Sequence, residues 1–234
     1  RVEVPRGWRA IANGTLDGAD TLPSGRTAWR YRMPQPIPVY NMVVGAGPLT
    51  VTALRGGSCA SPCVPVTVWS YPQDSAYAVS GPFRRAAEIV DWFTRLVGPF
   101  PYPSLAHVES STIFGGAENA SAIFYGDRLY RDHRMTERIV AHETAHQWFG
   151  DGVTETDWHH LWLSEGFATY FAALWDGHVG GDSALRHTMG DAATSVFEVR
   201  DSSGSRPNPV TERPILDPAA TDLMGLLNTN NYPK

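Results

Sequence analysis

The chain has 234 residues, which is enough for one large domain or two smaller ones. Hydrophobic residues make up 42% and charged residues 18%, as is normal for a globular protein with a real core. The formal net charge of −5 argues against nucleic acid or an anionic membrane surface as the main partner, and no apolar run approaches the roughly 20 residues that span a bilayer.

The first third of the chain predicts strands. Residues 1 to about 75 contain short β-type runs that proline and glycine punctuate closely. Three of these runs are "NMVVGAG", "LTVTALRGG" and "VPVTVWSYP". We therefore expect residues 1–75 to form a β-rich module.

The only two cysteines of the chain lie together in this region. Cys59 and Cys63 occur in "GGSCASPCVP", and one thiol pair offers too few ligands for a structural zinc site. A local disulfide is favoured over two free thiols, and a disulfide favours an oxidising compartment. The pair is therefore an indication of a secreted protein.

The pattern becomes helical at "SGPFRRAAEIVDWFTRLVGPFPYP". Ser80 can cap a helix, Pro82 suits the first turn, and apolar residues then recur with helical spacing up to Val97. Gly98 and Pro99 are stop signals. We therefore predict one helix that begins near Ser80 and ends at Val97.

Two strand-like runs, "LAHVESS" and "SAIFYG", come after this helix. Helical patterns then cover residues 135–150, 161–177 and 182–199 approximately. The tail at 201–218 is rich in proline and is expected to be irregular.

The first of these three helical patterns carries "IVAHETAHQWFGD". His142 and His146 are four residues apart, so on a helix their Cβ atoms lie ~5–6 Å apart and both imidazoles can reach one zinc ion. Glu143 falls on the flank of the same face, and H-E-x-x-H on a helix is the zinc peptidase signature. The alternative is an ordinary buried helix that carries two hydrogen-bonded histidines.

The second helical pattern, "HHLWLSEGFATYFAALW", carries one acid. The segment is apolar on nearly every side and should be buried, and a buried carboxylate needs a cation or hydrogen bonds. We therefore predict that Glu165 is a third zinc ligand. Two histidines and one glutamate leave a coordination position open for water, as in catalytic zinc sites. The alternative is an acid that interacts with the helix macrodipole. The residues that share a helix face with Glu165 are mostly small and permit close helix packing: Leu161, Ala168, Thr169 and Ala172.

These motifs together resemble the gluzincin zinc aminopeptidases, the family of aminopeptidase N and leukotriene hydrolase. "HETAH" is followed by eighteen residues and then a glutamate, as in that family, and "LWLSEGFATYF" is similar to its L-W-L-N-E-G-F-A segment. "GGAEN" is similar to its G-A-M-E-N motif, and "NNYPK" to its Y-x-K-G motif. "VPRGWRAIANG" and "VPVTVWSYP" also resemble its N-terminal β-domain, so the resemblance covers essentially the whole chain.

The resemblance implies an α+β protein. Residues 1–75 would be the end of a β-rich N-terminal domain, and residues 76–234 a thermolysin-like, mainly helical zinc peptidase domain that is incomplete at its C-terminus. The start "RVEVPRGW" is neither a signal peptide nor a methionine start. We therefore expect a fragment of a longer protein.

The resemblance also implies roles for residues at the motif positions. One Zn²⁺ per chain would be held by His142, His146 and Glu165. Glu143 would be the general base, taking a proton from the attacking water and later passing it to the leaving amine. Tyr232 would donate its phenolic hydrogen to the oxyanion.

The "GGAEN" segment would read the substrate's N-terminus. A carboxylate there can bind the free α-ammonium of a peptide, while the preceding backbone forms an edge beside which the peptide lies. The alternative for this segment, taken alone, is a flexible surface loop. The implied substrate-binding residues are Gly115, Gly116, Ala117, Glu118 and Asn119.

Three positions depart from the family pattern. The family's methionine is Ala117 here, which changes the first specificity pocket, and its asparagine before the zinc glutamate is Ser164. His160 replaces an aspartate, and both of the latter changes fall where contacts would orient the metal ligands. His159 and His160 could bind metal adventitiously, but polar residues at a helix start are the favoured interpretation.

The sequence therefore predicts a zinc aminopeptidase acting on peptides with a free N-terminus. The alternatives are a catalytically silent scaffold or binding relative, and a bifunctional epoxide hydrolase and aminopeptidase. A thermolysin-type endopeptidase is disfavoured, because an endopeptidase has no use for the acid in "GGAEN".

Overall fold

The computed structural model describes residues 1–55 and 63–197. Cys63 is disulfide-bonded, whereas Cys59 lies outside the described residues. The expected irregular tail at 201–218 and Tyr232 lie outside them as well.

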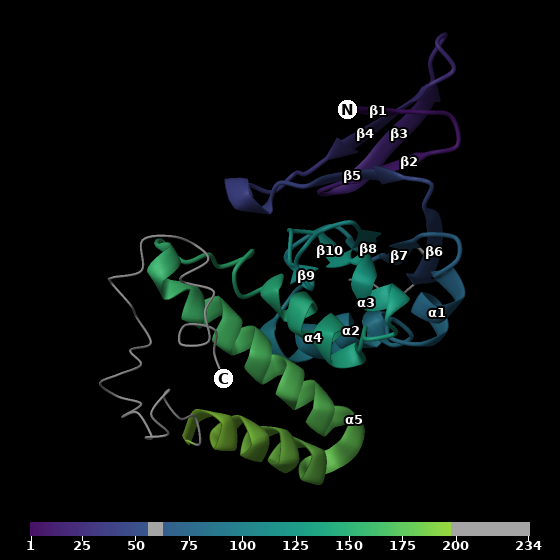
Figure 1. Cartoon of the computed structure of the whole chain (residues 1–234). Coiled ribbons are helices and arrows are strands. Elements are labelled where there is room, and N and C mark those ends of the chain that lie inside the picture. Colours follow the sequence, from purple (N-terminus) through teal and green to yellow (C-terminus); the bar gives the residue numbers. More distant parts are fainter. Residues whose placement is uncertain (56–62, 198–234) are drawn as a thin grey trace, which may run out of the picture.

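The N-terminal part of the chain consists of short antiparallel strands, drawn in purple and dark blue in Figure 1. One sheet has the order β1-β4-β3, and a separate pair is formed by β2 and β5. A small core of Val4, Ala10 and Trp29 lies among these strands. Their bounds are β1 Val2–Val4, β2 Arg9–Ala12, β3 Thr15–Thr21, β4 Thr27–Arg32 and β5 Val44–Gly47.

The middle of the molecule is a mixed five-stranded sheet with the order β6-β7-β8-β10-β9. β7, β8 and β10 run parallel, whereas β6 and β9 are antiparallel edge strands. The strands predicted in "LTVTALRGG", "VPVTVWSYP", "LAHVESS" and "SAIFYG" are all present in it. Their bounds are β6 Thr50–Arg55, β7 Val66–Ser70, β8 Leu105–Ser110, β9 Gly116–Ala117 and β10 Ala122–Gly126.

The division expected near residue 75 does not follow the sheets. β6 and β7 precede that position, yet β7 hydrogen bonds to β8 in the same sheet. Pairing in one sheet favours a division between β5 and β6.

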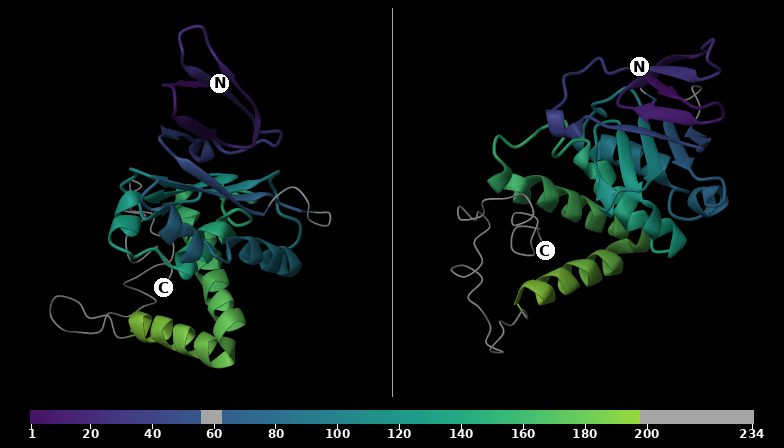
Figure 2. Two further views of the ribbon diagram at one scale, coloured as in Figure 1. Left: turned by 90° about the vertical axis from the view of Figure 1, so that its right-hand side faces the viewer. Right: turned by 45° about the horizontal axis from the view of Figure 1, so that its top comes forward.

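The five-stranded sheet is covered on both faces, and both views in Figure 2 show the resulting layers. One face packs against the N-terminal strands through apolar side chains such as Ile11, Leu49 and Phe124. The other face packs against helices and forms the main core of the described residues, which includes Phe83, Phe93 and Trp175. The region is therefore α+β, as predicted.

The helix predicted from Ser80 to Val97 begins later than expected. Ser80 ends a separate helix, α1 (Ser75–Ser80), in which its hydroxyl donates to the carbonyl oxygen of Ala76 over 2.7 Å, so it does not cap the next helix. The chain turns before α2 (Ala86–Val97) begins. Gly98, with φ 133°, ends α2 as predicted.

The remaining helices lie after β9. A short helix, α3 (Asp127–Arg131), precedes α4 (Glu137–His146), which is the helix predicted over 135–150. Two 3-10 turns, η1 (Val39–Asn41) and η2 (Trp158–His160), border the site described below. None of the helices within the described ranges is both long and apolar enough to cross a lipid bilayer.

The last element of the described residues, α5 (Leu161–Phe197), bends sharply, as Figure 1 shows in green and yellow. Gly181 has φ 77° and ψ −178°, which breaks the helix into the two segments that the sequence predicts. The first segment is buried on one face only, whereas its nearly all-round apolar sequence led us to expect a buried helix. Its outer face leaves Leu163, Phe167 and Tyr170 between 40% and 47% exposed, because α4 covers only the opposite face.

Candidate metal centre and substrate edge

α4 begins with a defined cap. The Thr136 side chain accepts a hydrogen bond from the backbone N–H of Ile139 at 3.3 Å, and Glu137 places an acid in the first turn, where the macrodipole favours it. The helix runs to His146, so that His142 and His146 lie one turn apart on the face that meets α5.

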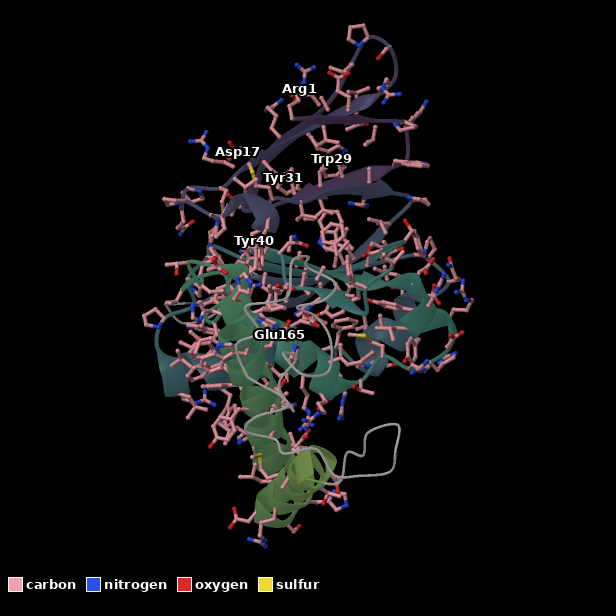
Figure 3. All side chains as sticks on the ribbon, turned by 60° about the vertical axis from the view of Figure 1, so that its left-hand side comes forward. Arg1, Asp17, Trp29, Tyr31, Tyr40 and Glu165 are labelled. Atoms are coloured by element: carbon pink, nitrogen blue, oxygen red, sulfur yellow. The ribbon has the colours of Figure 1, made fainter. Side chains whose placement is uncertain are left out.

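Three predicted ligand atoms converge between α4 and α5. The Nε2 atoms of His142 and His146 lie 3.2 Å apart. Glu165 Oε2 lies 3.2 Å from the first of these nitrogens and 3.5 Å from the second. All three atoms lie within 4.8 Å of one another, and Glu165 is labelled on α5 in Figure 3.

The second histidine is oriented by the backbone. His146 Nδ1 lies 3.0 Å from the carbonyl oxygen of Phe149. A carbonyl can only accept, so Nδ1 carries a hydrogen, and Nε2 is the ring nitrogen that faces Glu165. This arrangement is typical of metal-ligating histidines, whose other ring nitrogen donates to a fixed acceptor.

The charges in the cluster fit a cation. Burial by itself raises the pKa of Glu165, but the contacts with His142 and His146 outweigh it and hold this pKa at about 2. Burial lowers the pKa of His142, which favours the neutral imidazole that binds metal. Burial also lowers the pKa of His146, but the facing carboxylate of Glu165 and the nearby Glu118 outweigh it and raise this pKa well above its usual value, so a positive charge is favoured at the focus of the cluster. Glu165 is 5% exposed, and its Oε2 has no hydrogen-bond partner among the described residues.

Two neutral imidazoles and one carboxylate are the donor set of catalytic zinc sites, which keep a further position open. The orphaned oxygen of Glu165 and the shared focus of the three ligand atoms fit such an ion. The helix-dipole alternative for Glu165 is disfavoured, because its carboxylate faces the two histidines.

Glu143 lies between the metal ligands and the sheet. It is 7% exposed, and burial raises its pKa to about 8. Its carboxylate lies so close to β9 that a Cβ atom added to Gly116 would be 2.1 Å from Glu143 Oε1. The base candidate therefore lies against the strand beside which we expect a peptide.

That strand is the outer edge of the five-stranded sheet. β9 pairs with β10 so that Gly116 lies opposite Tyr125 and Ala117 opposite Phe124. Its other edge has no strand partner among the described residues. Gly116 and Ala117 of the "GGAEN" segment thus form a strand, and Glu118 and Asn119 follow it without regular secondary structure.

One cavity of about 810 Å³ collects the candidate residues. It is bordered by the three ligand candidates, by Glu143 and by the whole segment from Gly115 to Asn119. Glu118 is half-buried within it. Among the predicted site residues only Tyr232 is not placed, since it lies outside the described ranges.

Two aromatic residues at this cavity were missed from the sequence. The rings of Tyr40 and Trp158 meet edge to face with centroids 4.8 Å apart, and both border the cavity. The Tyr40 hydroxyl donates to the carbonyl oxygen of Gly150 at 3.0 Å, and Figure 3 places Tyr40 between the N-terminal strands and Glu165. No local pattern marks Tyr40, because its partners are distant in the chain.

A set of buried polar residues was also missed. Gln147 and Asp151 come after the H-E-x-x-H motif and are almost wholly buried, as are Asn13 and Asn41 in the N-terminal part. The available signal was the spacing of Gln147 and Asp151, polar residues four apart in the apolar stretch "HQWFGD".

The departures from the family pattern are accommodated locally. Ser164 is buried beside Glu165, and its hydroxyl bonds to the carboxylate of Glu155 and to the carbonyl oxygen of Leu161. His159 bonds to Asp157, which caps η2, so the histidine pair lies at a helix start as expected.

Comparison with known proteins is consistent with this geometry. Residues 83–232 match the Peptidase family M1 domain. Leukotriene A-4 hydrolase of Xenopus laevis is 27% identical over 189 residues, which are 78% of this chain and 29% of that protein. Aminopeptidase B of Rattus norvegicus is 29% identical over 173 residues, which are 72% of this chain and 24% of that protein.

Solved structures agree with these relatives. An M1 zinc metallopeptidase from Deinococcus radiodurans superposes with a TM-score of 0.70 at 26% identity, over 83% of this chain and 42% of that chain. A variant of that enzyme bound to a Tyr-Ser-Ala substrate gives a TM-score of 0.70 at 25% identity, over 85% of this chain and 44% of that chain. The chain spans less than a third of these two curated relatives. Since the family match covers more than half of it, the chain belongs to peptidase family M1.

Proposed function

We propose that this protein is a zinc-dependent aminopeptidase, which hydrolyses the N-terminal peptide bond of peptides. The observation that carries the proposal is one shared cavity. It joins a metal-ligand triad to a sheet edge that ends in the half-buried carboxylate of Glu118.

The metal would be held by His142, His146 and Glu165, whose ligand atoms already face one another. When bound, zinc supplies Lewis acidity that polarises a carbonyl and makes water more acidic. The hydrogen bond from His146 to Phe149 keeps that ligand's free nitrogen directed at the shared focus.

Glu143 would act as the general base. Its carboxyl group is buried between α4 and β9, and the positive charge of a bound zinc ion would favour its ionised form. The carboxylate could then take a proton from the attacking water and pass it to the leaving amine. Tyr232 would donate a hydrogen bond to the oxyanion, a role assigned by its motif position alone.

The substrate would lie along the outer edge of β9. Main-chain hydrogen bonds to Gly116 and Ala117 would extend the sheet by one strand. Glu118 would bind the α-ammonium group by a charge-assisted hydrogen bond and so measure one residue from the terminus to the cleaved bond. Asn119 lines the same cavity and makes a 3.5 Å hydrogen bond to the carbonyl oxygen of Tyr40.

The test compares two substrates on the whole protein with zinc bound. Alanyl anilide and its N-acetyl form share every group except the free amine. We expect hydrolysis of the free amine only, with loss of that selectivity in Glu118→Ala. Hydrolysis of both compounds by the unsubstituted protein would support an endopeptidase instead, and hydrolysis of neither would support a silent scaffold.

A further inference from the structure

A connected set of buried side chains joins the end of α4, the zinc helix that carries His142 and His146, to the turn after β9, the candidate substrate edge. Its members, which we call the buried amide network, are Asn13, Asn41, Gln147 and Asp151. Gln147 is the central member. It comes directly after the metal-ligand candidate His146, and none of its surface is exposed.

Gln147 holds both ends of one short turn. Its Nε2 donates to the carbonyl oxygen of Glu118 and to Asp151 Oδ2, at 2.7 Å each. Its Oε1 accepts from the backbone N–H of Ser121 at 2.8 Å. Because both amide hydrogens and the oxygen are used, the side chain has one orientation and fixes the turn from Glu118 to Ser121.

The other members hold Asp151 and the middle of the same turn. Asn41 Nδ2 donates to Asp151 Oδ1 at 2.7 Å. Asn13 Nδ2 donates to the carbonyl oxygens of Asn41 and Ala120, at 2.8 Å and 2.7 Å. The network therefore starts at the end of α4, passes through Asn41 and Asn13 in the N-terminal part of the chain, and returns to the turn at Ala120.

The turn needs such support because its backbone is strained. Ser121 has φ 65°, a left-handed conformation that costs free energy in a residue other than glycine. Its hydroxyl also accepts a hydrogen bond from the N–H of Gly14 at 2.6 Å. Strain of this kind persists only where surrounding contacts determine the conformation, as they do here.

We propose that the buried amide network is a positioning device for the free-amine subsite: Gln147 and Asn13 set where Glu118 stands relative to the metal ligands. This inference rests on the proposed function. Gln147 is next to His146 in the chain and bonds to the backbone of Glu118, so one side chain links the metal centre to the acid that reads the terminus. Neither Gln147 nor Asn13 lines the cavity, so both act through Glu118.

The experiment measures binding rather than turnover. Alanine hydroxamate and N-acetylalanine hydroxamate share a zinc-binding group and differ in the free amine. Calorimetry on the whole zinc-loaded protein gives the ratio of their two affinities, which reports how well the amine is read. In Gln147→Met we expect this ratio to fall by about tenfold, because the turn loses two hydrogen bonds and Asp151 loses one, while zinc affinity stays within about threefold.

Two further variants make the outcome decisive. Asn13→Ala frees the middle of the turn and also removes the hydrogen bonds of Asn13 to Asn41 and Val43. Since Asn13 is far along the chain from α4, this variant should lower the ratio in the same direction even if Gln147→Met does not fold. Thr144→Val is the control on α4, since the buried hydroxyl of Thr144 has no hydrogen-bond partner within the described ranges, and its ratio should equal that of the unsubstituted protein.

Each result has one reading. A lowered ratio with zinc retained supports the positioning role. An unchanged ratio in the folded Gln147 and Asn13 variants, or an equal loss of both ligands, overturns it while the proposed function stands. Equal affinities in the unsubstituted protein overturn the proposed function, and the positioning role with it.

Discussion

His146 donates a 3.0 Å hydrogen bond from Nδ1 to the carbonyl oxygen of Phe149, three residues along the chain. Gly150, the residue after Phe149, makes this hydrogen bond possible. Gly150 has φ 122°, and a Cβ there would lie 3.4 Å from His146 Nδ1 and 3.3 Å from the Ser164 side chain. The backbone after α4 therefore has the conformation that allows the hydrogen bond from His146 to Phe149.

Gly150→Ala should accordingly weaken both the fold and the metal site. The left-handed backbone and the crowding at His146 should lower the free energy of unfolding by about 1–3 kcal/mol, as urea denaturation would measure. Zinc affinity should fall as well. Gly190→Ala is the control, because that α5 position has open space around it and should tolerate alanine. Equal stability of the two variants would contradict this account.

Glu165→Gln should separate metal binding from folding. The substitution keeps the side chain's size but removes the charge that the two histidines face, so zinc affinity should fall by more than ~100-fold, beyond the effect typical of residues that only support a ligand. Zinc should raise the melting temperature of the unsubstituted protein but not of this variant. Glu88→Gln, at an exposed position of α2, is the matched control. A retained thermal response in Glu165→Gln would remove Glu165 from the ligand set.

Glu143→Gln should retain zinc and lose turnover. The amide fits the same space against β9 but cannot accept a proton, so kcat should fall by ~10²–10⁴-fold while the bound metal, measured by atomic absorption, stays at one ion per chain. Near-normal turnover in this variant would end the assignment of Glu143 as the base.

Tyr232→Phe should affect turnover more than substrate binding. The proposed hydrogen bond forms only as charge develops on the oxyanion, so kcat should fall more than KM rises. Tyr170→Phe, on the exposed face of α5, is the control and should leave both constants unchanged. A change confined to KM would make Tyr232 a ground-state contact.

Glu109 should make stability depend on pH. Burial chiefly raises its pKa to about 8, and the nearby carboxylates of Asp74 and Asp127 act in the same direction. Between the unfolded value of about 4.5 and this folded value, the folded state binds a proton that the unfolded state lacks, so stability falls as pH rises through that window.

Glu109→Gln removes this dependence. The amide oxygen of the variant would still accept from the N–H of Tyr71, as Glu109 Oε2 does over 2.8 Å. The variant should gain about 1–3 kcal/mol in free energy of unfolding, relative to the unsubstituted protein, on going from pH 5 to pH 8. Denaturation curves at both pH values would measure this, and a constant difference would show that Glu109 titrates normally.

The cluster of metal-ligand candidates could be predicted because its signals are local. His142 and His146 lie within one helical turn, and the acid at Glu165 stands out in an apolar helix. The small residues on its face, among them Ala168 and Ala172, are buried as predicted, which allows the close packing of α4 and α5.

The features that the sequence did not predict depend on contacts between distant residues. Ser80 has the chemistry of a cap, but tertiary packing places it at the end of α1, so α2 starts later. The bond from Asn13 to Ala120 joins residues 107 positions apart. No spacing rule reaches that far, so the buried amide network and the role of Tyr40 emerge only from the fold.

The path of hydrogen bonds from Asn13 through Asn41 to Asp151 also bears on cooperativity. If β2 and β5 separated from the sheet beneath them, Asp151 would lose the donor on Asn41, and the turn at Ala120 would lose Asn13. Such losses are costly in a buried site, so these strands and the end of the zinc helix should open together. We therefore expect the N-terminal strands and the candidate metal centre to unfold as one unit, although the ligand candidates lie on α4 and α5, far from these strands in the chain.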